Sequence, residues 1–351
     1  MAFGTAKRQG VVVLGATGMV GQRMLHMLHC HPSLEVVALC ASDRSAGRRY
    51  GDACRWLMPG EPYAGLAHLE VLPCEPGAIA GAVSAPGVAL SALPRGVARQ
   101  LEPALAAAGW AVVSNASAYR DDPAVPLVIP EVNAAHLDVL GDQVLVTNPN
   151  CTAIPVAMTL APLHRTVGVE AVCVASYQAV SGAGYPGESA YDMIGNVRPH
   201  PGDEEQKLAT EVAKILGTVE GGRIRAAELT VSARCVRAPV VDGHLVAVQV
   251  RTREPIAPQD AIELWKGWRA PVDLPTGVEH PVWVREERDR PQPRIDAGAG
   301  DGMAITVGRV EPCPVMGLKF FAIAHNTVRG AAGAAILNVE LLQHRGLVAA
   351  D

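Results

Sequence analysis

The stretch VVVLGATGMVGQRMLHML, residues 11–28, decides the fold of the first half of the chain. Its apolar run Val11–Leu14 is typical of a strand buried on both faces of a parallel sheet. Glycines at positions 15, 18 and 21 follow at once, and residues 22–29 carry apolar side chains at helical spacing. A second apolar run, Leu34–Leu39, comes next. This order of strand, glycine turn, helix and strand predicts one unit of a parallel α/β sheet.

The glycine turn favours binding of a dinucleotide. Glycine allows backbone N–H groups to approach a pyrophosphate, and the N-terminus of the following helix attracts the anion. A tight strand–helix turn without a ligand is the alternative, but the place of the turn directly after an apolar strand favours binding. The residues expected to contact the cofactor here are Gly15, Thr17, Gly18, Met19, Val20 and Gly21.

The end of the second strand bears on which nicotinamide cofactor binds. Arg44 stands between Ser42 and Ser45, and a fixed cation with two hydroxyl donors suits the 2′-phosphate of NADP. Asp43 could instead accept hydrogen bonds from the ribose hydroxyls of NAD. An ordinary polar loop is a third interpretation. We favour NADP(H), with Ser42, Arg44 and Ser45 as contacts.

Strand and helix patterns keep alternating along the first half of the chain. The apolar runs occupy residues 88–93, 110–114 and 144–147, and the helical patterns occupy 97–108 and 153–163. Such alternation predicts an α/β fold that begins with a Rossmann-like, doubly wound parallel sheet.

The pattern changes from about residue 168. Long polar or Gly/Pro-rich segments now separate the strands, which we expect at 171–179, 228–236, 245–251 and 318–324. They predict an α+β domain with a mixed, largely antiparallel sheet. We therefore expect an NADP-binding domain over residues 1–150, joined by a C-terminal helix within 326–351. A catalytic and oligomerisation domain would cover residues 151–325.

Composition excludes several function classes. The net charge is −5, no long basic run occurs and aromatic residues make up 4% of the chain, so a nucleic-acid partner is not expected. The sequence contains no stretch of about 18 apolar residues, so we expect no membrane span. The first residues lack the apolar region of a signal peptide. The eight cysteines form no CxxC pair, which argues against a metal site or a disulfide framework. We expect a cytoplasmic protein.

Cys151 occupies an unusual context within Asn148–Thr152, between an apolar strand and a predicted helix. A helix N-terminus lowers the pKa of a thiol, and its free N–H groups stabilise an oxyanion, so Cys151 is a candidate nucleophile. The alternative is a buried structural cysteine. His244 follows a glycine and precedes an apolar strand, which makes it a candidate acid or base, although its position alone favours a structural role.

The chain also contains many motifs in a fixed order: GATGMVG, SNASAYR, VPLVIPEVN, NPNCT, QAVSGAGYPG, GDEEQK, RAPVVDGH, DRPQPR and NTVRGAAG. Over nearly its whole length it resembles the aspartate-semialdehyde dehydrogenase family, especially the archaeal and fungal branch. N-acetylglutamyl-phosphate reductases are more distant relatives of that family, and archaeal malonyl-CoA reductases form a close sister group.

The resemblance implies roles for individual residues. Cys151 matches the nucleophile of the family, His244 the acid–base residue and Gln178 a residue that orients the substrate. The implied substrate-binding residues are Arg120, Asn150, Glu204, Lys207 and Arg237, with Arg237 on the α-carboxylate and Arg120, Asn150 and Lys207 near the phosphate. Further implied cofactor contacts are Ser181, Gly182 and Asn326.

Two of these assignments stay open. Glu204 is the implied partner of the substrate ammonium group, but Glu205 next to it is a competitor. Lys207 could simply be an i,i+3 helix partner of Glu204.

The resemblance further implies NADPH-dependent, reversible reductive dephosphorylation of L-aspartyl-4-phosphate to L-aspartate 4-semialdehyde, through a thioester on Cys151. This step belongs to the biosynthesis of lysine, threonine, methionine and isoleucine, and the family implies a homo-oligomer, either a dimer or a tetramer. A malonyl-CoA reductase or another acyl-phosphate or acyl-CoA reductase is the alternative within the same chemistry. A non-catalytic NADP-binding protein is the alternative outside it.

Overall fold

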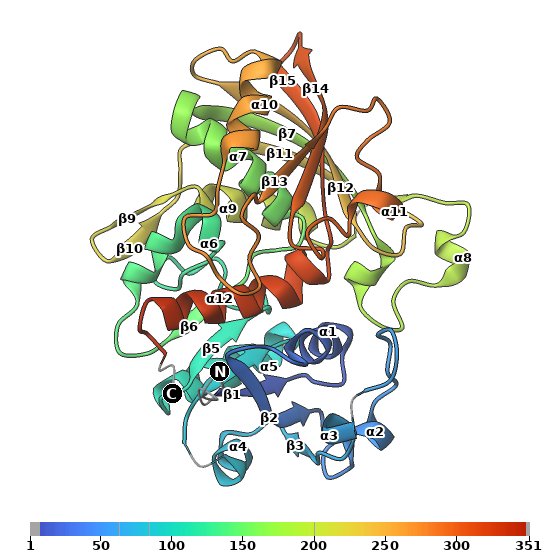
Figure 1. Cartoon of the computed structure of the whole chain (residues 1–351), viewed down its shortest axis with the longest axis vertical. Coiled ribbons are helices and arrows are strands. Elements are labelled where there is room, and N and C mark those ends of the chain that lie inside the picture. The colour runs from blue at the N-terminus through green and yellow to red at the C-terminus, as the bar shows by residue number, and fades with distance from the viewer. Residues whose placement is uncertain (1–7, 63, 84, 200, 349–351) are drawn as a thin grey trace, which may run out of the picture.

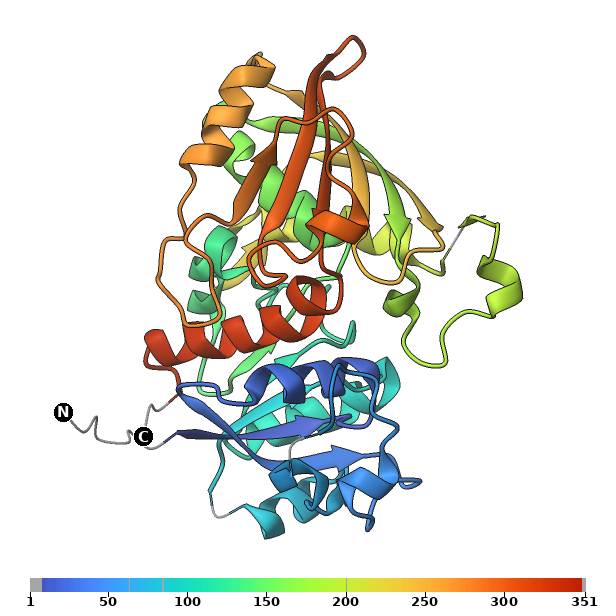
Figure 2. The ribbon, with the colours of Figure 1, turned by 45° about the vertical axis from the view of Figure 1, so that its right-hand side comes forward.

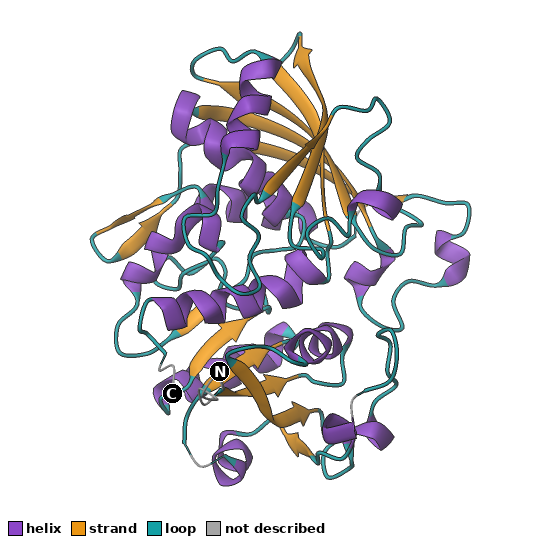
Figure 3. Ribbon diagram, in the orientation of Figure 1, coloured by secondary structure: helices purple, strands orange, loops and turns teal. Residues whose placement is uncertain are grey.

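The computed structural model describes residues 8–348 except 63, 84 and 200. The two ends of the predicted cofactor domain, residues 1–7 and 349–351, lie outside the described residues. Figure 3 shows two separate sheets, each with helices packed beside it. Within the described part of the chain, every helix falls short of the length and hydropathy that a membrane crossing requires.

The first sheet is parallel throughout, with the strand order β3-β2-β1-β4-β5-β6. Its strands are β1 (Gln9–Leu14), β2 (Leu34–Ala41), β3 (Val71–Pro73), β4 (Val88–Ser91), β5 (Ala111–Ser114) and β6 (Leu145–Thr147). This order confirms the predicted doubly wound sheet. Only β3 has no counterpart among the expected strands, because three residues carry too little pattern to be recognised.

Helices cover both faces of this sheet because alternate residues of a strand point in opposite directions. Val11 and Val13 of β1 belong to a core that also contains the C-terminal helix, whereas Val12 and Leu14 belong to a core with α5. The helices of this half are α1 (Met19–Leu28), α2 (Tyr50–Ala53), α3 (Ala64–Ala67), α4 (Pro76–Ala82), α5 (Arg95–Ala107) and α6 (Pro130–Asn133), with a 3₁₀ segment at Ala134–Val139.

The second sheet is mixed, with the order β13-β14-β15-β12-β7-β11-β8. Its strands are β7 (Val169–Gln178), β8 (Arg198–Pro199), β11 (Thr230–Arg237), β12 (His244–Thr252), β13 (Val282–Arg285), β14 (Ile305–Cys313) and β15 (Gly317–Ala324); β9 (Thr218–Glu220) and β10 (Arg223–Arg225) form a separate hairpin. Antiparallel pairs predominate, with parallel contacts only at β7–β11 and β13–β14 among the described strands, as predicted.

One face of the second sheet is covered by helices and the other is left open. The covering helices are α7 (Ala153–Val167), α9 (Glu204–Ile215) and α10 (Pro258–Gly267). Trp265 of α10 packs edge to face against Phe320 of β15, with 4.9 Å between the ring centroids. On the open face Tyr177 and Cys173 of β7 are exposed. Two short helices, α8 (Ala190–Met193) and α11 (Pro293–Asp296), and a 3₁₀ turn at Val180–Ala183 lie in loops.

The chain ends in a π-helical turn, Val328–Ala332, followed by α12 (Gly333–His344). A single helix was expected here. Figures 1 and 2 both show α12 running between the two sheets, and its side chains join the core of the first sheet. The division of the chain into two domains, with the C-terminal helix assigned to the cofactor domain, stays a prediction.

Candidate active site

A cavity of about 560 Å³ lies at the carboxyl ends of β4 and β5, where ligands bind in doubly wound sheets. Elements of the second sheet close its other side. Among the expected site residues it is lined by Val20, Arg120, Asn150, Cys151, Gln178, Ser181, Gly182, Glu204, Lys207, Arg237, His244 and Asn326. The structure thus brings every expected catalytic and substrate-binding residue to one cavity.

The prediction missed twelve residues that also line it: Ala92, Leu93, Pro94, Arg95, Asn115, Ala116, Ser117, Ala183, Gly184, Thr327, Gly330 and Ala331. Residues 92–95 and 115–117 directly follow β4 and β5, so the strand-end rule for parallel sheets was the signal that could have found them.

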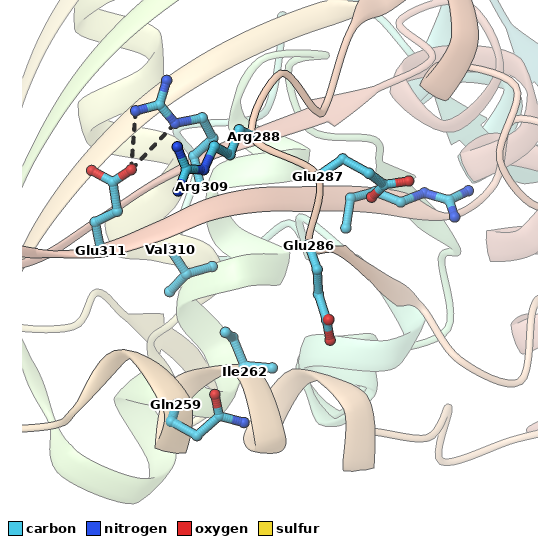
Figure 4. A pocket seen from close by; sticks show the side chains of 9 residues that line it. Gln259, Ile262, Glu286, Glu287, Arg288, Arg309, Val310 and Glu311 are labelled. Atoms are coloured by element: carbon cyan, nitrogen blue, oxygen red, sulfur yellow. Dashed lines mark hydrogen bonds and ion pairs between the residues drawn. The ribbon is translucent and has the colours of Figure 1, made fainter.

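A second hollow, of about 830 Å³, shares no lining residue with the first. Figure 4 shows it between α10 and the strands β13 and β14, bordered by charged side chains such as Arg309 and Glu311, which pair with each other. Its lining contains no cysteine or histidine. We therefore place the chemistry in the smaller cavity.

Cys151 lies two residues before α7 and is half-buried, which confirms its predicted position at a strand–helix junction. The backbone of Gly330 packs directly against it: a Cβ atom on Gly330 would stand 2.7 Å from the Cys151 Cβ and 3.2 Å from its Cα. Gly330 belongs to the π-helical turn at the start of the C-terminal helix. This turn therefore brings residues from the end of the chain against the thiol.

The electrostatics around Cys151 correct one expectation. Burial, reinforced by the Glu204 carboxylate, raises the pKa of the thiol to about 12, although Arg120 and Arg237 act in the opposite direction. The position near a helix N-terminus therefore does not by itself produce a thiolate in the ligand-free site. The thiol is protonated until binding or reaction changes its surroundings.

The backbone N–H groups next to Cys151 are already engaged. The Asn150 N–H donates to Glu211 Oε2 at 2.5 Å, and the Thr152 N–H donates to Asn150 Oδ1 at 2.8 Å. The Ile154 N–H donates to the Asn150 carbonyl at 3.1 Å. The expectation that free N–H groups around Cys151 hold an oxyanion is therefore wrong for these three groups.

His244 opens β12 and is fully buried. Its Nδ1 accepts a hydrogen bond from the Ala179 N–H at 3.0 Å, and its Nε2 has no hydrogen-bond partner in the part of the chain that the structure describes. A backbone N–H can only donate, so Nδ1 carries no hydrogen and the neutral ring carries its proton on Nε2. Burial, with Arg237 and His325, lowers the pKa of the ring to about 3. His244 is a neutral donor in this state rather than the base that its position alone suggested.

Gln178 connects two sides of the site. Its Nε2 donates to Thr152 Oγ1 at 3.0 Å, and its Oε1 accepts from Arg237 Nη1 at 3.2 Å. Arg237 also donates to the Ala179 carbonyl at 3.0 Å and is buried. Within the described ranges its Nε has no hydrogen-bond partner, and the carboxylate of Glu188 lies 3.7 Å from it.

The two acidic residues at the start of α9 point to different places. Glu204 lines the cavity, where its Oε2 accepts from Asn150 Nδ2 at 2.7 Å and its Oε1 pairs with Lys207 Nζ at 3.2 Å. Glu205 instead binds Arg234 at 2.9 Å and does not line the cavity. Lys207 forms the i,i+3 pair that was one interpretation of it, and it lines the cavity as well.

Arg120 reaches the cavity from the loop after β5. Its Nη1 donates to Glu211 Oε1 at 3.1 Å and its Nη2 to the Asn115 carbonyl at 2.6 Å, while its Nε is unpaired and buried. Arg120, Arg237 and His244 thus each keep one buried N–H without a hydrogen-bond partner among the described residues, and all three side chains line the same cavity. Because buried donors are usually paired, acceptor atoms of a ligand in this cavity would satisfy these three N–H groups.

The glycine turn has the geometry of a phosphate cradle. Gly15 has φ +81°, and a Cβ on it would stand 2.6 Å from the Ala92 carbonyl oxygen. A Cβ on Gly21 would stand 2.3 Å from the Gly15 carbonyl oxygen. Gly18 precedes α1 and no side chain caps this helix, so its N-terminal N–H groups are open to an anion. Thr17 and Met19 in this turn are half-buried.

The other expected cofactor contacts differ in how accessible they are to a ligand. Ser42 and Arg44 are exposed after β2, whereas Ser45 is buried and less accessible to a ligand than expected. Ser181 Oγ donates to Asp242 at 2.8 Å and accepts from Asn326 Nδ2 at 2.8 Å. These two residues therefore form one polar cluster on the cavity wall, next to Gly182.

Comparisons with known proteins agree with this geometry. The family model described as "Semialdehyde dehydrogenase, NAD binding domain" matches residues 10–140, and "Semialdehyde dehydrogenase, dimerisation domain" matches residues 160–329. The aspartate-semialdehyde dehydrogenase of Archaeoglobus fulgidus is 45% identical over 95% of this chain and 98% of its own length. The chain belongs to the aspartate-semialdehyde dehydrogenase family.

Two further members extend the comparison within and beside this family. A crystal structure of aspartate-semialdehyde dehydrogenase with NADP from Candida albicans superposes with a TM-score of 0.89 at 33% identity, covering 97% of this chain and all of that one. A malonyl-CoA reductase (NADP) of Metallosphaera sedula is 33% identical over 96% of this chain and 97% of its own length. The resemblance read from the motifs, including the sister group, is thereby confirmed.

Proposed function

We propose that this chain catalyses the reversible, NADPH-dependent reduction of L-aspartyl-4-phosphate to L-aspartate 4-semialdehyde through a thioester on Cys151. The observation that carries the proposal is the set of three buried, unpaired donors around one thiol, on Arg120, Arg237 and His244. Family membership supports it, since relatives at 45% and 43% identity are named aspartate-semialdehyde dehydrogenases.

The charges in the cavity match the three charges of this substrate. Arg237 is suited to the α-carboxylate, and Glu204 to the ammonium group. Arg120 and Lys207, with Asn150, suit the phosphate. Glu204 rather than Glu205 takes the ammonium, because only Glu204 lines the cavity.

In the first step the sulfur of Cys151 attacks the acyl carbon. The S–H bond breaks and the proton passes to the leaving phosphate, a C–S bond forms and the C–O bond to phosphate breaks, so that a thioester and hydrogen phosphate result. The oxyanion that develops accepts a hydrogen bond from His244 Nε2–H, the unpaired donor beside it. Gln178 is hydrogen-bonded both to Arg237 and to Thr152 at the start of α7, so it keeps the distance between these two residues constant during this step.

Bound NADPH supplies the hydride that reduces the thioester carbon. The glycine turn would hold its pyrophosphate, and Ser181, Gly182 and Asn326 would bound the nicotinamide side of the cavity. When the C–S bond then breaks, its electron pair returns to the Cys151 sulfur, which takes up a proton from solvent. The exposed Arg44 and Ser42 support NADP over NAD, as does the NADP in the Candida albicans structure.

We also propose that the protein is a cytoplasmic homo-oligomer that serves the biosynthesis of lysine, threonine, methionine and isoleucine. The dimerisation domain match over residues 160–329 supports an oligomer. The open face of the second sheet is a suitable contact surface, because Tyr177, Leu245, Ala247 and Phe321 share it through the strand register. The oligomeric state is tested by analytical ultracentrifugation.

A malonyl-CoA reductase is the second candidate, favoured by the Metallosphaera sedula relative. A malonyl group has no ammonium for Glu204 to bind. A side-by-side assay with L-aspartyl phosphate and malonyl-CoA decides between the two. The proposal expects NADPH oxidation with the first substrate and none with the second, and the reverse result overturns it.

A further inference from the structure

Glu211 is a carboxylate beneath the site that the proposed chemistry leaves without a role. It lies on α9 and is 1% exposed. Its two oxygens hold two different parts of the cavity wall: Oε1 accepts from Arg120 Nη1 at 3.1 Å, and Oε2 accepts from the Asn150 N–H at 2.5 Å. Arg120 is the cation that the proposed function assigns to the phosphate, and Asn150 directly precedes the proposed nucleophile Cys151.

The next turn of the same helix holds the loop that carries Arg120. Lys214 Nζ donates to the backbone carbonyls of Arg120, Asp122 and Val125 at 2.7, 2.6 and 2.8 Å. The helix therefore fixes Arg120 twice, through its backbone and through its guanidinium. The hydrogen bonds of Arg120 use Nη1 and Nη2, and its buried Nε has no partner among the described residues.

We propose that Glu211 is a positioning residue that sets the Arg120 guanidinium and the Asn150–Cys151 backbone at a fixed separation, so that a phosphate on Arg120 lies where the Cys151 sulfur attacks. The inference rests on the proposed function, since it assigns the phosphate to Arg120. A carboxylate is required because both neighbours are donors. A carboxamide offers one acceptor, and its NH₂ group faces the second donor.

The negative charge of Glu211 has a separate effect on the thiol. The charged groups that shift the pKa of Cys151 are Glu204, Arg120, Arg237 and Glu211. Glu204 and Glu211 oppose thiolate formation, and the two arginines favour it. Lys207, Arg95 and the neutral His244 also line the cavity. Burial raises the pKa of Glu211 itself, while Arg120 and the Asn150 N–H favour its charged form. Loss of that charge lowers the pKa of Cys151, an effect that a purely structural residue does not have.

The test compares Glu211→Gln with Glu220→Gln, which removes an exposed carboxylate on β9 far from the cavity lining. Inorganic phosphate is the probe, and its affinity is read from protection of Cys151 against iodoacetamide, which needs no turnover. We expect Glu211→Gln to weaken phosphate binding by about tenfold or more, the loss typical of a hydrogen bond to a charged group. Unprotected alkylation at a fixed pH should become faster, while Glu220→Gln matches the wild type in both respects.

Two results overturn the inference: unchanged phosphate affinity in folded Glu211→Gln, or alkylation that is no faster than in the wild type. If Glu211→Gln does not fold, as judged by its melting curve, Glu211→Asp decides. It keeps the charge but shortens the reach, so weaker phosphate binding with an unchanged alkylation rate is expected, and unchanged binding contradicts the proposal. If phosphate fails to protect even the wild type, the acyl-phosphate function itself is wrong.

Discussion

The backbone N–H of Ala179 donates to Nδ1 of His244, 65 residues further along the chain, at 3.0 Å. This hydrogen bond fixes which nitrogen of the ring carries the proton, and it leaves the buried Nε2–H unpaired among the described residues, on a side chain that lines the cavity. The proposed function assigns this neutral ring the role of a hydrogen-bond donor to the substrate oxygen.

The first prediction concerns the pH dependence of this donor. Burial, Arg237 and His325 disfavour the protonated ring and lower its pKa to about 3, so the ring is neutral at every pH above that value. The pH profile of kcat should therefore show no loss of activity through the ordinary histidine range near pH ~6.5. A limb in that range that disappears in a His244 variant would contradict the assignment.

Replacing the ring should be costly. His244→Ala is expected to lower kcat by about 10²- to 10⁴-fold, the usual contribution of a positioned acid–base group, with a much smaller change in KM. His344→Ala, an exposed histidine at the end of α12, is the matched control and should retain wild-type kcat. Steady-state kinetics in both directions measures the effect, and wild-type kcat in His244→Ala would exclude the role.

The second prediction concerns the thiol of the ligand-free protein. Burial and Glu204 raise its pKa to about 12, so the thiolate fraction grows tenfold for each pH unit below that value. Alkylation of Cys151 by iodoacetamide should keep accelerating from about pH 7 to about pH 10 without a plateau. Mass spectrometry of the Cys151 peptide separates this reaction from that of the other cysteines, and a plateau near pH ~8 would contradict the shift.

The third prediction tests the contact between the π-helical turn and the nucleophile. Gly330→Ala places a Cβ 2.7 Å from the Cys151 Cβ, so backbone must shift and kcat should fall by at least about tenfold. The strain should cost about 1–3 kcal/mol of stability, measurable by denaturant unfolding. Gly77→Ala, where a Cβ meets nothing within 4 Å, is the control. Equal kinetics in the two variants would show that this contact is dispensable.

The fourth prediction addresses the choice of cofactor. Arg44→Ala should raise the KM for NADPH by roughly tenfold and leave that for NADH nearly unchanged, because the proposal assigns the exposed guanidinium to the 2′-phosphate alone. Asp43→Ala is the counterpart, and it should not raise the KM for NADPH. A larger effect of Asp43→Ala on NADH than of Arg44→Ala on NADPH would favour NAD as the working cofactor.

Much of the first sheet was predictable because its signals are local. Each of its main features can be recognised within a few residues: the apolar run Val11–Leu14, the glycine turn and the strand–helix junction at Cys151. The strand β14 was not recognised, because its register shifts between Gly308 and Glu311 and breaks the alternation of its side chains.

The catalytic constellation was predictable only in part. The sequence predicts Cys151 and His244 as candidate catalytic residues, and both line the cavity. The position of the proton on His244 depends on the distant Ala179, which no local pattern reveals. Glu211 was missed for a related reason. A single glutamate on a helix is usually a solvated charge, and only the packing of α9 against the Arg120 loop buries it.

The most direct test of the account is whether an acyl group becomes attached to Cys151. The protein is mixed with aspartate semialdehyde and NADP in the absence of phosphate, so that the thioester has no phosphate acceptor, and its intact mass is measured after acid quenching. The account predicts an added aspartyl group that hydroxylamine removes and that Cys151→Ala never acquires. An unmodified wild-type protein that has nevertheless formed one equivalent of NADPH, or an equal adduct on Cys151→Ala, would contradict it.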